Sequence, residues 1–303
     1  MPTATLVQEA RVRECPFRNN LLVNPGFEIW QRGAGPFTVS YAFCADEWAL
    51  NHNGSMSVSR STSALFGNYC PSIVATLTTG QSAGLNQGVE AYKSLEGQWL
   101  TFSCWVNTDA ANAVVIAIQD TTSGGNESVA GDIHPGDSQW HLLTVTKKIR
   151  TGLIPRTSGS EHNYGIVVSV SAAYGVSANT LMDGAVCAAG YFPEGLQYVP
   201  PNPAQDMLRC ERYYQKNDSG SSWASTAMWT GKTVSGNWYY NSIPFSTPMA
   251  ATPTVTLTNY GNSAFGVSSS LGCNGRRGFW NWRQASANNN RGYFGDEWKA
   301  EVT

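Results

Sequence analysis

Residues 100–106 read Leu-Thr-Phe-Ser-Cys-Trp-Val, a run in which every second residue is apolar. In an extended chain these apolar side chains share one face, and the hydroxyl side chains lie on the other. The same period of two recurs at Ile73–Leu77, Val114–Ile118 and Ile166–Val170, and Leu181–Ala189 is largely apolar. Alternation of this kind, with Ser and Thr between the apolar positions, predicts half-buried antiparallel strands.

The segments between these runs, such as Thr121–Gly125 and Arg156–Gly159, are rich in Gly, Ser, Thr and Asn. This composition is typical of turns. Many short strands with no helical stretch between them predict an all-β fold of the β-sandwich or jelly-roll kind.

One segment, residues 200–216, departs from this pattern. It begins Pro-Pro-Asn-Pro, in which Asn202 suits a helix N-cap and Pro203 the first helical position. The apolar stripe expected on this helix consists of Met207, Leu208, Cys210 and Tyr214. The prolines before the helix indicate a domain boundary.

We therefore expect four parts. Residues 1–20 hold a few apolar residues scattered among charges, so they are predicted to be an arm without a core of its own. Residues 21–199 form the jelly-roll sandwich, and residues 200–216 form the short linking helix. Residues 217–303, dense in Trp and Tyr, form a smaller C-terminal β-sandwich that is expected to bind a receptor or to form the trimer contact.

Composition excludes several classes of protein. The 303 residues include 19 Lys and Arg against 21 Asp and Glu, and charged residues make up 13%, about half of the usual ~25%. A net charge of −2 argues against nucleic-acid binding and against a polybasic membrane surface. No run approaches ~18 apolar residues, and residues 1–20 do not resemble an export signal. We expect no nucleic-acid binding, no membrane insertion and assembly in a cytoplasm.

Motifs for catalysis or metal binding are scarce. The seven Cys are widely spaced and form no Cys-x-x-Cys pair, which favours reduced core thiols. No zinc-protease, phosphate-loop or serine-hydrolase motif occurs, so we expect no enzyme. Asp132, His134 and Asp137 are close enough to ligate a metal, but Pro135-Gly136 between them indicates an ordinary solvated turn.

The aromatic residues carry the strongest functional signal. Trp280 and Trp282 are two residues apart and thus on one strand face, and Trp238 and Tyr240 share this spacing. Aromatic rings stack on sugar faces, and Arg residues can bind the acidic groups of bacterial polysaccharides. The predicted ligand-binding residues are Trp280, Trp282, Arg283 and Trp238, with Arg276 and Arg277 nearby. The same residues would also suit a subunit interface or a core, and Trp48, Trp99, Trp105 and Trp140 are expected in the core.

Two groups of motifs resemble known families. Asn20–Glu28 (Asn-Leu-Leu-Val-Asn-Pro-Gly-Phe-Glu) resembles the opening of jelly-roll carbohydrate-binding modules of the family 4/16/22 type, and Leu181–Val186 is similar to their last strand. The continuation Ile29–Gly33 (Ile-Trp-Gln-Arg-Gly), then Cys44–Trp48 (Cys-Ala-Asp-Glu-Trp), resembles tailed-bacteriophage fibre and virion proteins, as does Cys210–Lys216. The resemblance covers residues 20–216 well and residues 217–303 loosely.

The resemblance to the carbohydrate-binding modules implies a structural Ca²⁺ held by Glu28 and Asp183. Carboxylates suit calcium, which takes six to eight oxygens. A second Asp often stands where this chain has Gly184. The alternative is that Glu28 pairs with Arg32 or caps a turn.

The resemblance to the phage proteins implies a virion fibre or spike subunit, on head or tail, that assembles in the bacterial cytoplasm. Residues 1–20 would dock on other virion proteins, a homotrimer would form, and the β domains would bind host surface polysaccharide. The alternative is a purely structural head-decoration or tail-connecting protein without glycan binding. A polysaccharide depolymerase is less favoured because such enzymes are typically long parallel β-helices, and a secreted binding module would need an export signal.

Overall fold

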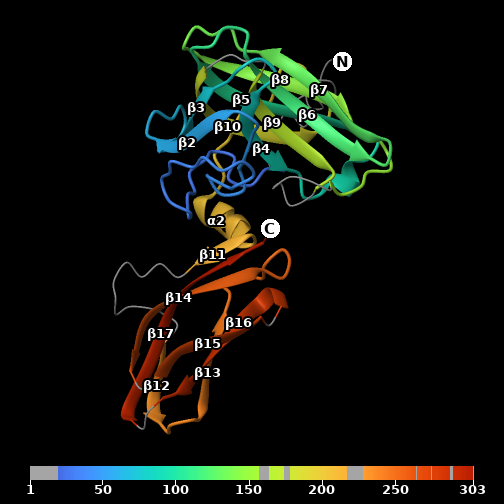
Figure 1. The fold of residues 1–303 in the computed structure, drawn as a ribbon. Coiled ribbons are helices and arrows are strands. Elements are labelled where there is room, and N and C mark those ends of the chain that lie inside the picture. Colours follow the sequence, from blue (N-terminus) through green and yellow to red (C-terminus); the bar gives the residue numbers. More distant parts are fainter. Residues whose placement is uncertain are drawn as a thin grey trace. The chain divides into compact units, whose positions relative to one another are not determined.

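The computed structural model describes residues 20–156, 164–173, 178–216, 228–263, 265–273, 275–286 and 289–302. The chain divides into two compact units, Met1–Asp206 and Met207–Thr303. Both units are built from antiparallel β-sheets, as Figure 1 shows, so the fold is all-β as predicted. The predicted arm lies almost entirely outside the described residues.

The first unit is a jelly-roll-like sandwich of two five-stranded sheets. One sheet has the strand order β1-β4-β9-β6-β7 and the other the order β2-β3-β10-β5-β8. The strands of the first sheet are β1 (Ala49–His52), β4 (Ser82–Gly88), β6 (Val114–Thr122), β7 (Gly125–Ile133) and β9 (Ile166–Ala173). Those of the second are β2 (Ser55–Ser61), β3 (Cys70–Thr76), β5 (Trp99–Thr108), β8 (Trp140–Lys148) and β10 (Ala178–Ala189), and the short helix η1 covers Tyr92–Leu95.

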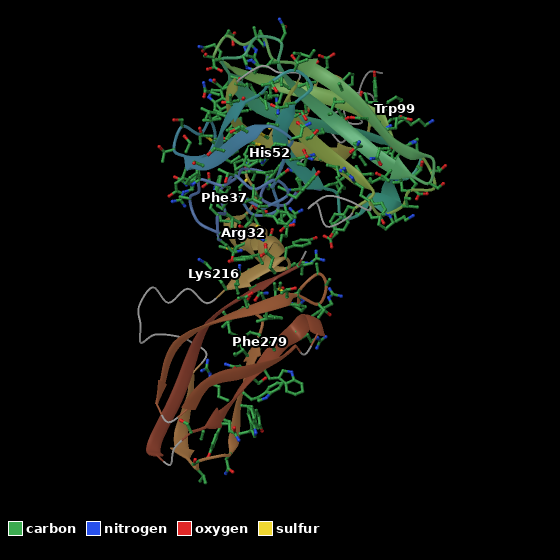
Figure 2. All side chains as sticks on the ribbon, viewed as in Figure 1. Arg32, Phe37, His52, Trp99, Lys216 and Phe279 are labelled. Atoms are coloured by element: carbon green, nitrogen blue, oxygen red, sulfur yellow. The ribbon has the colours of Figure 1, made fainter. Side chains whose placement is uncertain are left out.

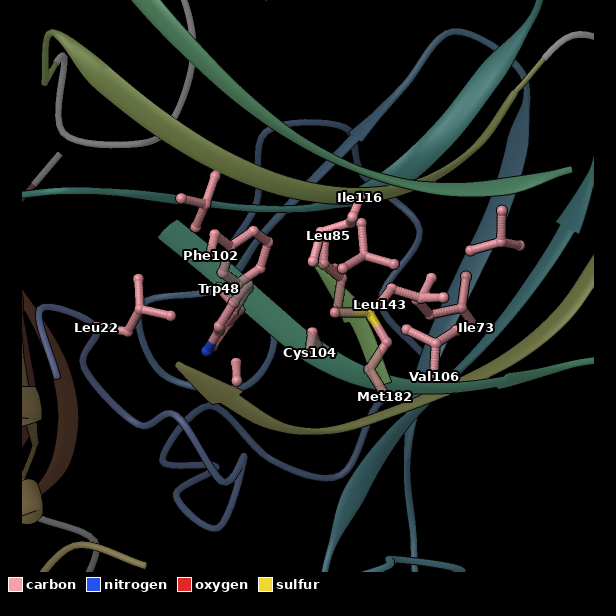
Figure 3. Close-up of a cluster of buried hydrophobic side chains, with 14 of the residues drawn as sticks. Leu22, Trp48, Ile73, Leu85, Phe102, Cys104, Val106, Ile116, Leu143 and Met182 are labelled. Atoms are coloured by element: carbon pink, nitrogen blue, oxygen red, sulfur yellow. The ribbon is translucent and has the colours of Figure 1, made fainter. Parts of the chain in front are cut away.

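The core of this unit fills the space between the two sheets. Phe102, Cys104 and Val106 of β5 are fully buried, which confirms the face predicted for residues 100–106. Figure 3 shows them beside Ile116, from a strand of the other sheet. Burying a large apolar side chain contributes roughly 1.5–3 kcal/mol. The period-two runs therefore hold the sandwich together.

The residues before β1 enter this core through a network of buried hydrogen bonds. The Asn24 side chain accepts from the backbone N–H of Ile29 (3.0 Å) and donates to the carbonyls of Ile29 (2.9 Å) and Asp46 (3.2 Å). Trp48 donates from Nε1 to the Asn24 carbonyl at 3.1 Å, and its ring is fully buried. These hydrogen bonds of Asn24 and Trp48 thus hold the segment 20–48 against the sandwich.

Asp46 is a fully buried acidic residue of this segment. It accepts hydrogen bonds from the backbone N–H and the side-chain Nε2 of Gln31, at 3.1 and 2.6 Å, and lies 3.4 Å from Arg32 Nη1. Loss of solvation nevertheless raises the pKa of Asp46 to about 6. Arg32 therefore pairs with Asp46 and not with Glu28.

Burial also shifts the thiol pKa of cysteines that form no disulfide. Cys44, Cys104 and Cys187 are fully buried in the sandwich. Desolvation raises the pKa of the Cys44 and Cys70 thiols to about 12. These residues are therefore the reduced core thiols that the sequence predicts.

The predicted helix is α2 (Pro203–Glu211). Asn202 caps it, because its Oδ1 accepts hydrogen bonds from the backbone N–H groups of Ala204 (3.0 Å) and Gln205 (3.3 Å). The predicted apolar stripe is only partly correct, since Met207 and Leu208 are exposed whereas Cys210 is buried. Asp206 is buried instead, and its Oδ1 accepts a hydrogen bond from the backbone N–H of Asn24.

The second unit is a smaller sandwich. In one sheet β17 pairs with β11, β12 and β14, and the other sheet has the order β13-β16-β15. Its strands are β11 (Tyr214–Lys216), β12 (Met228–Thr233), β13 (Trp238–Pro244), β14 (Thr254–Ser263), β15 (Phe265–Cys273), β16 (Gly278–Ala285) and β17 (Asn289–Glu301), and the short helix η2 covers Gly275–Arg277. Residues 214–216, placed in the linker by the sequence, thus belong to a sheet of this unit.

Candidate functional site

Four aromatic residues share one face of the β13-β16-β15 sheet. Tyr240 of β13 pairs directly with Trp282 of β16, and Trp238 and Trp280 lie two residues from them on the same side. Opposite residues of an antiparallel pair have Cβ atoms about 5 Å apart, and residues two apart on a strand are about 7 Å apart. We call Trp238, Tyr240, Trp280 and Trp282 the outer aromatic face.

This face is open to solvent. Tyr240 is 72% exposed, Trp238 53% and Trp280 43%, while Trp282 is partly buried. The alternation that predicted a shared face for Trp280 and Trp282 therefore places them as expected, and Trp238 joins them. Tyr240 is not among the predicted ligand residues, although its spacing from Trp238 signals it.

Arg283 does not belong to this face. It follows Trp282 directly, so its side chain points to the other side of the sheet, where it is only 1% exposed. Arg276 and Arg277 are exposed in η2, before β16 begins, and Arg276 donates from Nε to the Met249 carbonyl. The prediction that Arg283 assists the tryptophans in binding is thus corrected by the period of the strand.

The inner face of the same sheet is a core. Phe279 packs against Phe245 and Trp298, with ring centroids 5.9 and 5.2 Å away. Ile243 and Ala285 are buried on the same face of the sheet. Figure 2 labels Phe279 on this sheet. The sheet therefore has one face that stabilises the unit and one that is available to a ligand.

The first unit has a smaller aromatic pair. Trp99 and Tyr191 are 42% and 55% exposed, with ring centroids 4.8 Å apart in an edge-to-face arrangement. The prediction that Trp99 is a core residue is therefore wrong, because it opens β5 on the outward side of the strand. Trp48 is fully buried as predicted, and Trp105 and Trp140 are partly buried.

Glu28 and Asp183 both accept hydrogen bonds from the loop between β2 and β3. Glu28 Oε1 accepts hydrogen bonds from the backbone N–H groups of Asn68 (2.6 Å) and Tyr69 (3.0 Å), and Oε2 accepts one from the Asn68 side chain (3.2 Å). Asp183 Oδ2 accepts from the backbone N–H groups of Leu65 (2.7 Å) and Phe66 (2.9 Å). The two acids therefore anchor the ends of one loop segment, residues 65–69.

A β-bulge directs the Asp183 carboxylate toward this loop. The register between β10 and β5 shifts after Asp183, and Gly184 adopts a positive φ of 57°. The backbone N–H of Gly184 donates to Asp183 Oδ1 at 2.7 Å. Burial raises the pKa of Asp183, while these backbone donors oppose the shift.

These contacts do not fit the calcium ion that the resemblance implies. Ca²⁺ needs six to eight oxygen ligands with free lone pairs directed at it. Here all four carboxylate oxygens of Glu28 and Asp183 accept hydrogen bonds from N–H groups, most of them backbone amides. These N–H groups occupy six of the roughly eight lone pairs that the two carboxylates offer, so the two acids act as loop anchors.

A second group of possible metal ligands also has other partners. Donor atoms of His134, Asp137 and His141 lie within 4.8 Å of one another. However, His134 Nδ1 accepts from the Gly136 N–H at 2.9 Å, and its Nε2 faces the carbonyls of Val106 and Gln139 at 3.1 and 3.0 Å. Both ring nitrogens of this buried histidine are thus used by the backbone, and the third predicted residue, Asp132, binds the Thr144 N–H instead.

Comparisons with known proteins return solved structures only. No protein-family model and no curated protein matches the chain. The enzymatically active domain of tailspike protein 4 of bacteriophage CBA120 matches 56% of this chain and 21% of its own length, with 12% identity and a TM-score of 0.39. TmCBM61 in complex with β-1,4-galactotriose matches 57% of this chain and 99% of its own, with 21% identity and a TM-score of 0.34.

A third match is the C-terminal family 22 carbohydrate-binding module of Clostridium thermocellum Xyn10B. It covers 54% of this chain and 96% of its own, with 14% identity and a TM-score of 0.36. This chain spans about a fifth of the tailspike domain and nearly all of each binding module. With TM-scores below 0.5, none of these matches bears on what this chain binds.

Within the described residues, no helix is long and apolar enough to cross a membrane.

Proposed function

We propose that this chain is a glycan-binding subunit of a bacteriophage virion fibre or spike. The observation that carries the proposal is the outer aromatic face, where the exposed rings of Trp238, Tyr240 and Trp280 continue the ring of Trp282. A soluble protein gains stability by burying such rings, so their exposure in a row favours a role in binding. The order of the motifs at residues 20–48 supports the assignment to phage fibre proteins.

The contacts of the candidate acid and base residues also favour a binding role over catalysis. Glu28, Asp183 and His134, which are candidates for chemistry by residue type, are held by backbone groups. Hydrolysis of a glycosidic bond requires two carboxyl groups that flank the substrate. We propose that the chain binds polysaccharide without cleaving it, and purified protein should release no reducing ends from a polysaccharide that it binds.

The test is binding of the full chain to a panel of bacterial surface polysaccharides. The double variant Trp280→Ala/Trp282→Ala should lose binding, and Trp99→Ala is the matched control, because Trp99 is equally exposed on the other unit. Equal binding by the wild type and the double variant would refute the proposed site. Absence of binding by the wild type itself would favour the structural head-decoration or tail-connecting role.

Assembly is the remaining part of the proposal. We place the chain in the virion as a homotrimer attached through residues 1–20, which lie almost wholly outside the described residues. Deleting residues 1–17 should leave the folded units soluble but absent from purified particles. Sedimentation velocity should give a trimer, and a monodisperse monomer at micromolar concentration would contradict this part.

A further inference from the structure

We infer that the outer aromatic face binds an uncharged oligosaccharide of about three sugar units. This inference rests on the proposed glycan-binding function and specifies its ligand. It comes from three features of the sheet: the charge of the face, the order of its polar and aromatic positions, and its length.

The first feature is the absence of charge. The positions of β13 and β16 that point outward are Trp238, Tyr240, Ser242 and Pro244 on one strand and Gly278, Trp280, Trp282 and Gln284 on the other. None of these is ionisable at neutral pH, and Arg283 is buried on the opposite side. The face of an aromatic ring is electron-rich, so it attracts the C–H groups of a sugar and repels a carboxylate or phosphate. An acidic sugar would also lose solvation there without gaining a charged partner among these eight outward positions.

The second feature is the pairing of rings with polar residues across the strands. Trp280 lies opposite Ser242, and Trp238 lies opposite Gln284. Gln284 donates from Nε2 to the Gly236 carbonyl at 2.8 Å, which orients its amide. Each end of the ring row therefore offers an aromatic surface for the apolar face of a sugar and a hydrogen-bonding group for its hydroxyls.

This composition distinguishes a sugar from a second copy of the chain as the occupant. The inner face, which forms a core, combines the aromatic Phe279 with the aliphatic Ile243 and Ala285, and it also buries the polar residues Asn281 and Arg283. The outward positions of β13 and β16 contain no Leu, Ile, Val or Met. The two faces of one sheet thus differ in the way that a core and a sugar-binding surface differ.

The third feature is the length of the row. Trp280 and Ser242 form one level of the ladder, Trp282 and Tyr240 the next, and Trp238 and Gln284 the third. Levels two residues apart are separated by about 7 Å, so the row extends roughly 14 Å along the strands. A single sugar ring covers one level only, and binding should strengthen from one sugar to three and then level off.

The experiment measures binding of neutral glycans (β-galactan, xylan, β-glucan and mannan) and of acidic ones (alginate, polygalacturonate and polysialic acid) to the full chain. Each is measured in about 50 mM and about 500 mM NaCl, because screening weakens charge-driven binding. We expect at least one neutral glycan to bind, with an affinity that salt changes by less than about twofold. Trp282→Ala should weaken it about tenfold, the order of one aromatic contact.

Three further variants complete the design. Tyr240→Ala removes the most exposed ring of the face, at least risk to folding, and should also weaken binding. Arg277→Ala tests the exposed arginine next to the row, and Trp99→Ala tests an exposed ring elsewhere, and neither should change the affinity. Unaltered sedimentation and circular dichroism would show that each variant keeps its fold.

The possible failures differ in what they overturn. Binding of acidic glycans alone, weakened by salt and by Arg277→Ala, would overturn the inference and leave the proposed glycan-binding function in place. No binding to any glycan, with Trp282→Ala changing the oligomeric state, would assign the face to a second copy of the chain and overturn both. Neutral binding that is insensitive to Trp282→Ala and Tyr240→Ala would move the site elsewhere and overturn the inference.

Discussion

Replacing Asp46 by Asn should change how the stability of the protein depends on pH. Asp46 has no exposed surface, and burial raises its pKa from 3.8 to about 6 even though Gln31 and Arg32 donate to it. In the unfolded chain the carboxyl titrates near 3.9. Between these two values the unfolded state releases its proton while the folded state retains it.

The sign of the effect follows from this difference. Well below pH 4 the carboxyl is protonated in both states and costs no stability, and well above pH 6 it is ionised in both, so burial of the charge destabilises the fold. A shift of about two pKa units corresponds to about 3 kcal/mol. About 2 kcal/mol of this loss of unfolding free energy should fall between pH 4 and pH 7, because about half of the unfolded-state carboxyls are already ionised at pH 4.

The assay is urea denaturation of the wild type and of Asp46→Asn at several pH values from 4 to 7. Asn cannot ionise, so subtracting one series from the other isolates Asp46 from every other titrating group. The wild type should lose stability relative to Asp46→Asn with rising pH. A difference that is constant across this range, or that favours the wild type at higher pH, would show that burial does not raise the pKa of this carboxyl.

Three other predictions concern side chains of the first unit. Lys147 is buried and lies 3.3 Å from the buried Asp120, which also pairs with Arg150. Replacing Lys147 by Met should lower the free energy of unfolding by about 3 kcal/mol, because Asp120 then loses one of its two cations. A loss below ~0.5 kcal/mol in urea denaturation would contradict this. Loop N–H groups occupy most of the carboxylate lone pairs of Glu28 and Asp183, so neither CaCl₂ nor a chelator should move the melting temperature, whereas Glu28→Gln should lower it. A rise of the melting temperature with calcium would restore the metal site. The Cys44 thiol, whose pKa is about 12, should not react with a thiol reagent until the protein unfolds, and rapid labelling of the native protein would show that the segment 20–48 opens.

Local periodicity accounts for most of the successful sequence predictions. Residues 100–106 form β5 with the expected face inside, and Asn202 caps α2, because both patterns depend on neighbours in the sequence. Trp280 and Trp282 share an exposed face for the same reason. The prediction for Arg283 fails by the same rule, since a residue next to Trp282 must face the other way.

Other features depend on contacts that no local pattern encodes. Trp99 is exposed because it opens its strand on the outward side, while Trp48 is buried by a segment that joins the sandwich through Asn24. The partners of Asp183 are 117 and 118 residues away in the chain, and a bulge at Gly184 directs its carboxylate to them. The resemblance placed Glu28 and Asp183 near one site, but only the structure identifies backbone amides as their partners.

Stacking of sugars on the outer aromatic face can be observed by ¹⁹F NMR of the full chain labelled with 5-fluorotryptophan. Signals are assigned with single Trp→Phe variants, and a neutral trisaccharide of a glycan that the protein binds is then titrated. We predict that the signals of Trp238, Trp280 and Trp282 shift together and saturate at one dissociation constant, while the signal of the buried Trp48 stays in place. Shifts confined to Trp99, or no shift among the three tryptophans of the face at saturating ligand, would contradict sugar binding at this face.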